Sequence, residues 1–115
     1  MAYLAGSAGP DVEQLEEALT GRFLVMAPVV LSELLSAPDI SLEAEDFFQQ
    51  IPVLPITEGY WVRAGKLRGR LIQLGYKPKL ADTLIVQSCV DHRARLLTRG
   101  RDFRPFAKHA LLKLL

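Results

Sequence analysis

The sequence predicts an α/β fold with a mostly parallel sheet flanked by helices. Short apolar runs typical of buried strands alternate with longer segments in which apolar residues recur at helical spacing. Proline, threonine or aspartate precedes several of the helical segments, and glycine or proline follows them. Strands that alternate with helices favour parallel pairing. Because 115 residues suit one domain, we expect residues 1–115 to form a single unit.

The first half is expected to contain helices around two short strands. Asp11 can cap a helix that ends at Gly21. Residues 23–26 follow as a buried strand, and a helix then begins at Pro28, where proline is favoured, and ends before 37–39. We expect another helix from 41 to about 49.

The next segment combines an edge strand with an amphipathic helix. Residues 53–56 read as a strand, and Pro55 favours a place at the sheet edge. Thr57 is expected to cap a helix that stops at Gly75. The apolar positions of this helix recur at core spacing: Tyr60, Ala64, Leu67, Leu71 and Leu74. Its cations form a stripe: Arg63, Lys66 and Arg70.

The second half is organised around residues 79–103. A helix is expected after Pro78, with one face made by Leu80, Leu84 and Ser88, and an end near 92–93. The remaining predicted elements are a strand at 96–97, a loop at 98–102, a helix at 106–109 and a strand at 111–114.

Charge is divided sharply along the chain, although the net charge is only +1. Residues 1–59 hold one cation and ten acids, a net charge of −9, whereas residues 60–115 hold thirteen cations and three acids, a net charge of +10. A basic half favours a polyanionic partner such as nucleic acid. The alternative is that the two halves pair with each other at the surface of the folded chain.

The remaining composition is typical of a cytoplasmic protein. The single cysteine, Cys89, excludes an internal disulfide and is compatible with a reducing compartment. No apolar run has membrane-spanning length, and the N-terminus lacks the layout of a signal peptide. Neither His92 nor His109 has a second histidine or cysteine at metal-binding spacing, so each is expected to be a surface or cap residue.

Three acids stand among apolar neighbours, and each has a structural alternative. Glu33 lies in an apolar helix, where it could face solvent. Asp82 falls in a first helical turn, where a carboxylate is favoured by the helix dipole. Asp102 lies in a loop, where it could bond the backbone or pair with Arg99 or Arg101.

The residues around these acids resemble the PIN domain family, and most of all its VapC toxin branch. Segments 30–35, 80–85 and 97–103 look like the second, third and fourth PIN motifs. Leu-Ala-Asp at 80–82 and Thr-x-x-x-Asp-Phe at 98–103 form a fairly specific pair, and the resemblance extends over essentially the whole chain. It implies a three-layer PIN-like fold with helices on both sides of the sheet.

The resemblance further implies a Mg²⁺- or Mn²⁺-dependent endoribonuclease toxin that forms a homodimer and is inhibited by a cognate antitoxin. It assigns Glu33, Asp82 and Asp102 as catalytic metal ligands and Thr98 as a supporting residue. Hard divalent cations prefer such carboxylate oxygens. RNA contacts are expected from the flanking cations: Arg99, Arg101 and Arg104.

The sequence departs from the family pattern in two places. The family starts with a strand that ends in aspartate, and here residues 1–6 match the helix after it, so the first strand is expected to be absent and the domain N-terminally incomplete. Gly100 also occupies a position where many relatives have an acid. An alternative function is therefore a catalytically inactive or truncated PIN domain that binds RNA or an antitoxin.

Overall fold

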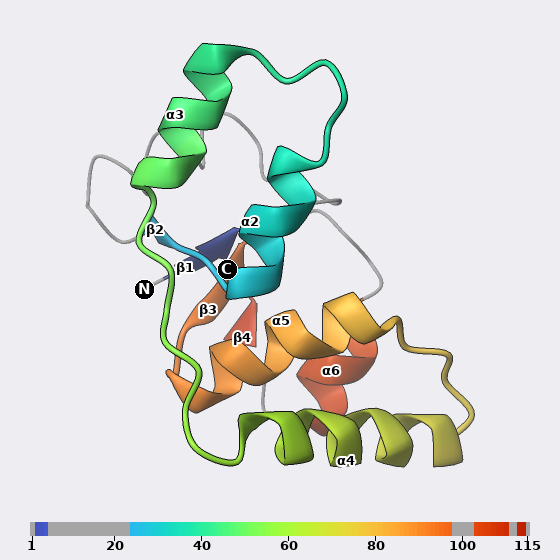
Figure 1. Ribbon diagram of the computed structural model, residues 1–115. Helices are drawn as coiled ribbons and strands as arrows, with labels where there is room; N and C mark the ends of the chain where they lie inside the picture. Colours follow the sequence, from blue (N-terminus) through green and yellow to red (C-terminus); the bar gives the residue numbers. More distant parts are fainter. Residues whose placement is uncertain (1, 5–23, 98–102, 111–112, 115) are drawn as a thin grey trace.

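A four-stranded parallel sheet forms the centre of the protein (Figure 1). The computed structural model describes residues 2–4, 24–97, 103–110 and 113–114. The spatial strand order is β2-β1-β3-β4, and each neighbouring pair is parallel. The strands are short: β1 (Ala2–Leu4), β2 (Leu24–Val25), β3 (Arg95–Leu97) and β4 (Lys113–Leu114). The predicted parallel pairing is confirmed.

The expected absence of a first strand is wrong. Ala2–Leu4, which we assigned to a helix, is the inner strand β1 and pairs with a neighbour on each side. Ala2 lies opposite Leu24 in β2 and Arg95 in β3. An inner strand forms backbone hydrogen bonds with the strands on both of its sides, which favours a strand here. The pattern of a segment as short as Ala-Tyr-Leu does not distinguish a helix from a strand, so the prediction failed.

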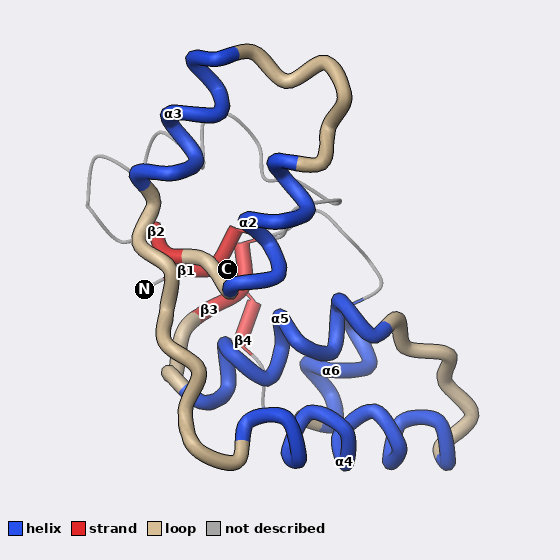
Figure 2. Tube along the Cα trace, viewed as in Figure 1, coloured by secondary structure: helices blue, strands red, loops and turns tan. Residues whose placement is uncertain are grey.

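The described residues include five helices, and their order agrees with the sequence predictions (Figure 2). They are α2 (Pro28–Leu35), α3 (Leu42–Gln50), α4 (Tyr60–Gln73), α5 (Leu80–Asp91) and α6 (Arg104–His109). Figure 1 shows α3 at one end of the molecule and α4 at the other, with α2 and α5 between them. The helix predicted from Asp11 to Gly21 lies outside the described residues.

The apolar core lies between the sheet and the inner faces of α2, α4 and α5. In α4, Tyr60, Ala64, Leu67 and Leu71 are buried as predicted, but Leu74 is 54% exposed because it follows the last helical turn. The predicted face of α5 is correct only in part, because Ser88 is buried and Leu84 is partly buried. Leu80 is 56% exposed, whereas seven residues between Asp82 and Cys89 are buried. The buried surface of α5 is wider than the apolar pattern predicted, because α5 contacts α2, α4 and β3 and therefore buries polar residues too.

Two further local predictions are corrected by backbone hydrogen bonding. Residues 53–56 form no strand: a single bridge joins Val53 to Met26, where the Met26 amide donates to Pro52 (2.9 Å) and the Leu54 amide donates to Met26 (3.0 Å). Proline on either side of that bridge cannot donate the bonds that would extend it. Thr57 does not cap α4, because the capping position is Gly59, whose φ of 80° favours glycine.

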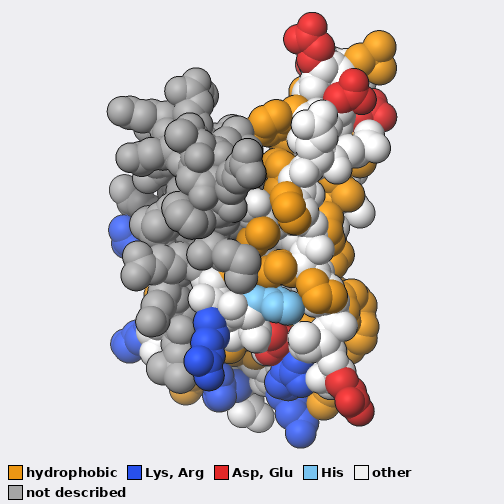
Figure 3. All heavy atoms as spheres, turned by 90° about the vertical axis from the view of Figure 1, so that its left-hand side faces the viewer, with side chains coloured by type: hydrophobic (Ala, Val, Ile, Leu, Met, Phe, Trp, Pro, Cys, Tyr) orange, Lys and Arg blue, Asp and Glu red, His pale blue; other side chains and the backbone are white. Residues whose placement is uncertain are grey.

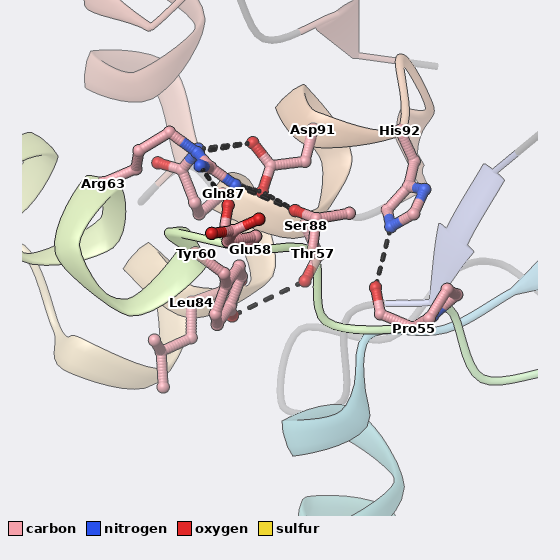
Figure 4. A network of polar contacts seen from close by, with 10 residues as sticks. All are labelled: Pro55, Thr57, Glu58, Tyr60, Arg63, Leu84, Gln87, Ser88, Asp91 and His92. Carbon is pink, nitrogen blue, oxygen red and sulfur yellow. Dashed lines mark hydrogen bonds and ion pairs between the residues drawn. The ribbon is translucent and has the colours of Figure 1, made fainter.

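A polar network fixes the C-terminal end of α5 against α4 (Figure 4). The Arg63 guanidinium donates to both carboxylate oxygens of Asp91, at 3.2 Å from Nε and 2.7 Å from Nη2. The same carboxylate accepts from Thr57 (3.0 Å) and Gln87 (2.9 Å). Burial acts to raise the pKa of Asp91, but these hydrogen bonds outweigh burial and leave that pKa below its ordinary value.

Asp91→Asn is expected to lower the free energy of unfolding by about 1–3 kcal/mol at pH 7, because the charged hydrogen bonds to Arg63 are lost. A carboxyl whose pKa is lowered by folding stabilises the protein above its unfolded pKa, and this contribution disappears as the pH falls through the folded pKa. The difference between wild type and variant should therefore shrink below pH 3.8.

Urea denaturation at pH 7 and at successively lower pH measures this difference. Glu58→Gln is the matched control, because Glu58 contributes only its backbone carbonyl to Arg63. A difference that stays constant with pH would contradict the role of the Asp91 charge.

Candidate metal site

Two acids from helices far apart in the sequence lie near each other where α2 contacts α5. Glu33 lies on α2 one turn after the fully buried Val30, so it shares the face that packs toward the core. Asp82 lies in the first turn of α5 and is only 7% exposed. The two helices contact each other, and the charge of Asp82 acts on Glu33. The structure therefore brings together the first two acids that the sequence singled out.

The Glu33 carboxyl lies in an environment that does not favour its charge. Its Oε1 atom is buried and has no hydrogen-bond partner among the described residues. Burial and the nearby Asp82 raise the pKa of Glu33 above its ordinary value, and Lys79 partly offsets this effect. A buried, unpartnered carboxylate oxygen costs free energy unless a cation or a donor reaches it. This donor set suits a hard divalent cation.

A cavity of about 250 Å³ opens beside Asp82. The loop between α4 and α5 contributes Tyr76, Lys77 and Lys79 to its wall, and α6 contributes Pro105 and Phe106. Asp82 therefore borders a cavity whose wall also carries two lysines, Lys77 and Lys79. Such cations offset the repulsion between a polyanion and the acids and so allow the polyanion to approach.

Of the other predicted site residues, the structure describes only Arg104. Arg104 is the exposed first residue of α6 and precedes Pro105 of the cavity wall. The remaining four predictions lie outside the described residues: Thr98, Arg99, Arg101 and Asp102. Within the described part of the chain, no three Asp, Glu, His or Cys side chains gather closely enough to hold a metal ion.

The end of the inner strand also departs from the pattern that the resemblance implies. Ala5 and Gly6 follow β1 in the sequence, where the family has an aspartate at the end of its first strand. Glu33 and Asp82 are thus the acids of the described site, and a third acidic ligand remains a prediction at Asp102.

Sequence reasoning did not assign Lys77, Lys79 and Tyr76 to the site. The available signal was their position, because Lys77 and Lys79 flank Pro78 directly before the helix that carries Asp82. The cationic stripe that the sequence did single out lines a different cavity, which is bounded by Arg63, Lys66 and Arg70.

Acidic and basic side chains, which are concentrated in different halves of the sequence, are also concentrated at different ends of the folded protein. On the face shown in Figure 3, several acidic side chains gather at the α3 end. Most Lys and Arg side chains lie toward the opposite end, where a few acidic side chains are also present. The α3 acids are Glu43, Glu45 and Asp46, and the α4 cations are Arg63, Lys66, Arg68 and Arg70. The two charged regions are therefore separated, and only one close ion pair, Arg63–Asp91, occurs among the described residues.

The buried cysteine and the two histidines have structural surroundings. Cys89 is fully buried, and burial raises the pKa of its thiol far above the ordinary value, so it is unsuited to nucleophilic chemistry. The His92 ring contacts the Pro55 carbonyl through Nε2 (2.9 Å), and His109 contacts the Tyr76 hydroxyl (3.2 Å). None of the helices in the described ranges is long and apolar enough to cross a membrane.

Comparison with known proteins places this chain in a recognised family. A family profile for the PIN domain matches residues 1–109, and the chain therefore belongs to the PIN domain family. A search of curated proteins gave no match.

Among solved structures, the fold is similar to a chain in the crystal structure of VapBC2 from Rickettsia felis bound to a DNA fragment from their promoter. The TM-score is 0.71 with 21% sequence identity, and the similarity covers 100% of this chain and 98% of that chain. At this identity the likeness establishes the fold.

Glu33→Gln is expected to raise the free energy of unfolding in metal-free buffer at pH 7 by about 0.5–1 kcal/mol, a small effect because solvent reaches this half-buried group. A carboxyl whose pKa is raised by folding destabilises the protein above its folded pKa, and this penalty vanishes below its unfolded pKa. The gain should therefore disappear below pH 4.5.

Urea denaturation in EDTA at pH 7 and pH 4 checks this expectation. Asp39→Asn, which removes a charge from an exposed turn, is the control and should change stability little. A variant less stable than wild type at pH 7 would show that the Glu33 charge stabilises the metal-free fold.

Proposed function

We propose that this protein is the toxin of a toxin–antitoxin pair and acts as a divalent-metal-dependent endoribonuclease. Membership of the PIN domain family and the VapBC2-like fold support this class of protein. Mg²⁺ or Mn²⁺ is the proposed cofactor, RNA the substrate and a cognate antitoxin the inhibitory partner. The cytoplasm is the proposed compartment, and a homodimer stays a prediction from the resemblance.

The observation that carries this proposal is that Glu33 and Asp82 lie near each other at the contact between α2 and α5. Two like charges in a partly buried position are unfavourable by themselves, as the raised pKa of Glu33 indicates. Proteins retain such pairs where a bound cation compensates them. The Oε1 atom of Glu33, which has no hydrogen-bond partner in the described part of the chain, offers a ligand atom for that cation.

The proposed roles follow from the chemistry of each group. Glu33 and Asp82 would hold the cation, and Asp102 is proposed as a third ligand, supported by Thr98. When bound, a divalent cation offsets charge on the scissile phosphate and activates a water molecule for hydrolysis. Arg104 at the start of α6 is positioned near the cavity to neutralise the RNA backbone, a role also proposed for Arg99 and Arg101.

One observation favours a second function, a catalytically inactive PIN domain that binds RNA or an antitoxin. Ala5 and Gly6 follow the inner strand in place of the family aspartate, and Gly100 replaces another acid. Fewer carboxylates bind Mg²⁺ and Mn²⁺ more weakly, because charge and ligand number set the affinity. Such a protein would keep its cationic surface without hydrolysing RNA.

Isothermal titration with Mn²⁺ at pH 7.5 tests the metal site. We expect weak binding with a dissociation constant of roughly 0.1–1 mM, as in sites with few acidic ligands. The double variant Glu33→Gln/Asp82→Asn should abolish it, because both substitutions keep side-chain size and remove the charges. The control Asp39→Asn/Glu43→Gln removes two exposed acids and should bind as wild type does.

Unchanged Mn²⁺ binding in the Glu33/Asp82 double variant would remove both residues from the site. Incubation of a labelled single-stranded RNA with Mn²⁺ or EDTA then separates the two functions. Mn²⁺-dependent cleavage that the double variant lacks supports the nuclease. RNA binding without cleavage by the wild-type protein in Mn²⁺ supports the binding module.

A further inference from the structure

The geometry points to the cavity beside Asp82 as a binding subsite for a backbone phosphate of single-stranded RNA, held by Lys77 and Lys79. This inference rests on the proposed function, because it takes RNA as the ligand. It assigns a role to the loop between α4 and α5, residues 76–79, which the acid pair alone does not explain.

The two lysines are placed to act on a ligand in this cavity. Both are exposed residues of the cavity wall, and neither forms an ion pair with any residue that the structure describes. An ammonium group with no protein partner is available to bind phosphate oxygens as a point charge. Lys79 also lies close enough to Glu33 to favour the charged form of that carboxyl.

The arrangement of charges indicates which phosphate would occupy the cavity. Asp82 lies at one wall and repels an anion, while two cations lie at the same cavity. A phosphate in the cavity is therefore expected to bind on the lysine side, next to the acid pair rather than on it. The phosphate to be cleaved would lie at Glu33 and Asp82, and its neighbour along the strand at Lys77 and Lys79.

The size and walls of the cavity also fit part of a nucleotide. Its volume of about 250 Å³ is slightly below the roughly 300–1,000 Å³ of pockets that enclose drug-sized ligands. Phe106 is buried beneath it, and the Tyr76 ring is held by its hydroxyl contact with His109. Aromatic walls beside cations are typical of single-stranded nucleic-acid sites.

The second basic cavity is a weaker candidate, because two of its cations are already engaged. Arg63 is paired with Asp91 and donates to the Glu58 carbonyl, and Arg70 donates to the His109 carbonyl (3.0 Å). A phosphate there would have to compete with these bonds, and the acid pair lies elsewhere: Asp82 and Asp91 are about 14 Å apart along the axis of α5.

Fluorescence anisotropy with a labelled single-stranded RNA in EDTA tests the subsite without catalysis. Lys77→Gln/Lys79→Gln is expected to weaken binding about tenfold at low salt and to reduce the slope of log K against log salt by about 0.7–1.4, the value for one or two phosphate contacts. The control Lys66→Gln/Arg93→Gln removes the same charge from exposed positions outside the cavity and should weaken binding less than threefold.

Equal losses in the two double variants, or no loss in the first, would overturn the subsite. Mn²⁺ titration of Lys77→Gln/Lys79→Gln separates this outcome from failure of the proposed function, and we expect the variant to bind Mn²⁺ as wild type does. Lost RNA affinity with retained Mn²⁺ binding supports the subsite. If the wild-type protein binds RNA through the lysines but binds no Mn²⁺, the subsite stands and the nuclease proposal fails.

Discussion

The proposed site depends on the contact between α2 and α5, where the carboxyl groups of Glu33 and Asp82 lie near each other in a partly buried environment. Glu33 has a raised pKa and a buried oxygen that lacks a partner among the described residues. Such a group lowers stability in the metal-free protein, so folding alone gives no reason for its presence. A cation bound between the two carboxyl groups would offset their repulsion. The contact between α2 and α5 therefore connects the fold to the proposed chemistry.

The rest of the molecule holds this contact in place. The inner strand β1 completes a parallel sheet, and the core beneath it includes Val30 from α2 and Val86 from α5. The network around Asp91 fixes the far end of α5 against α4, which sets the direction in which α5 presents Asp82. The polar network thus stabilises the C-terminal end of α5, whereas near its N-terminal end Asp82 lies close to a second carboxyl group, that of Glu33.

Much of this arrangement could be predicted from the sequence. Proline and glycine signals predicted α2 and the end of α4, and helical spacing predicted the buried positions Tyr60 to Leu71. The resemblance to PIN motifs selected Glu33 and Asp82, which could not be paired by spacing because two helices, α3 and α4, separate them along the chain. Strand β1 was missed because three apolar residues have no distinctive period. The full width of the buried surface of α5 was missed because several elements cover that helix. Lys77 and Lys79 were missed because cavity walls form only in three dimensions.

An anomalous difference map from crystals of the wild-type protein soaked in Mn²⁺ tests the proposed Glu33/Asp82 metal site most directly. We expect a peak between the carboxylates of Glu33 and Asp82, within about 2.0–2.6 Å of an oxygen from each, as is usual for hard cations on carboxylates. A map whose Mn²⁺ peaks all lie away from these two residues would contradict the proposed site.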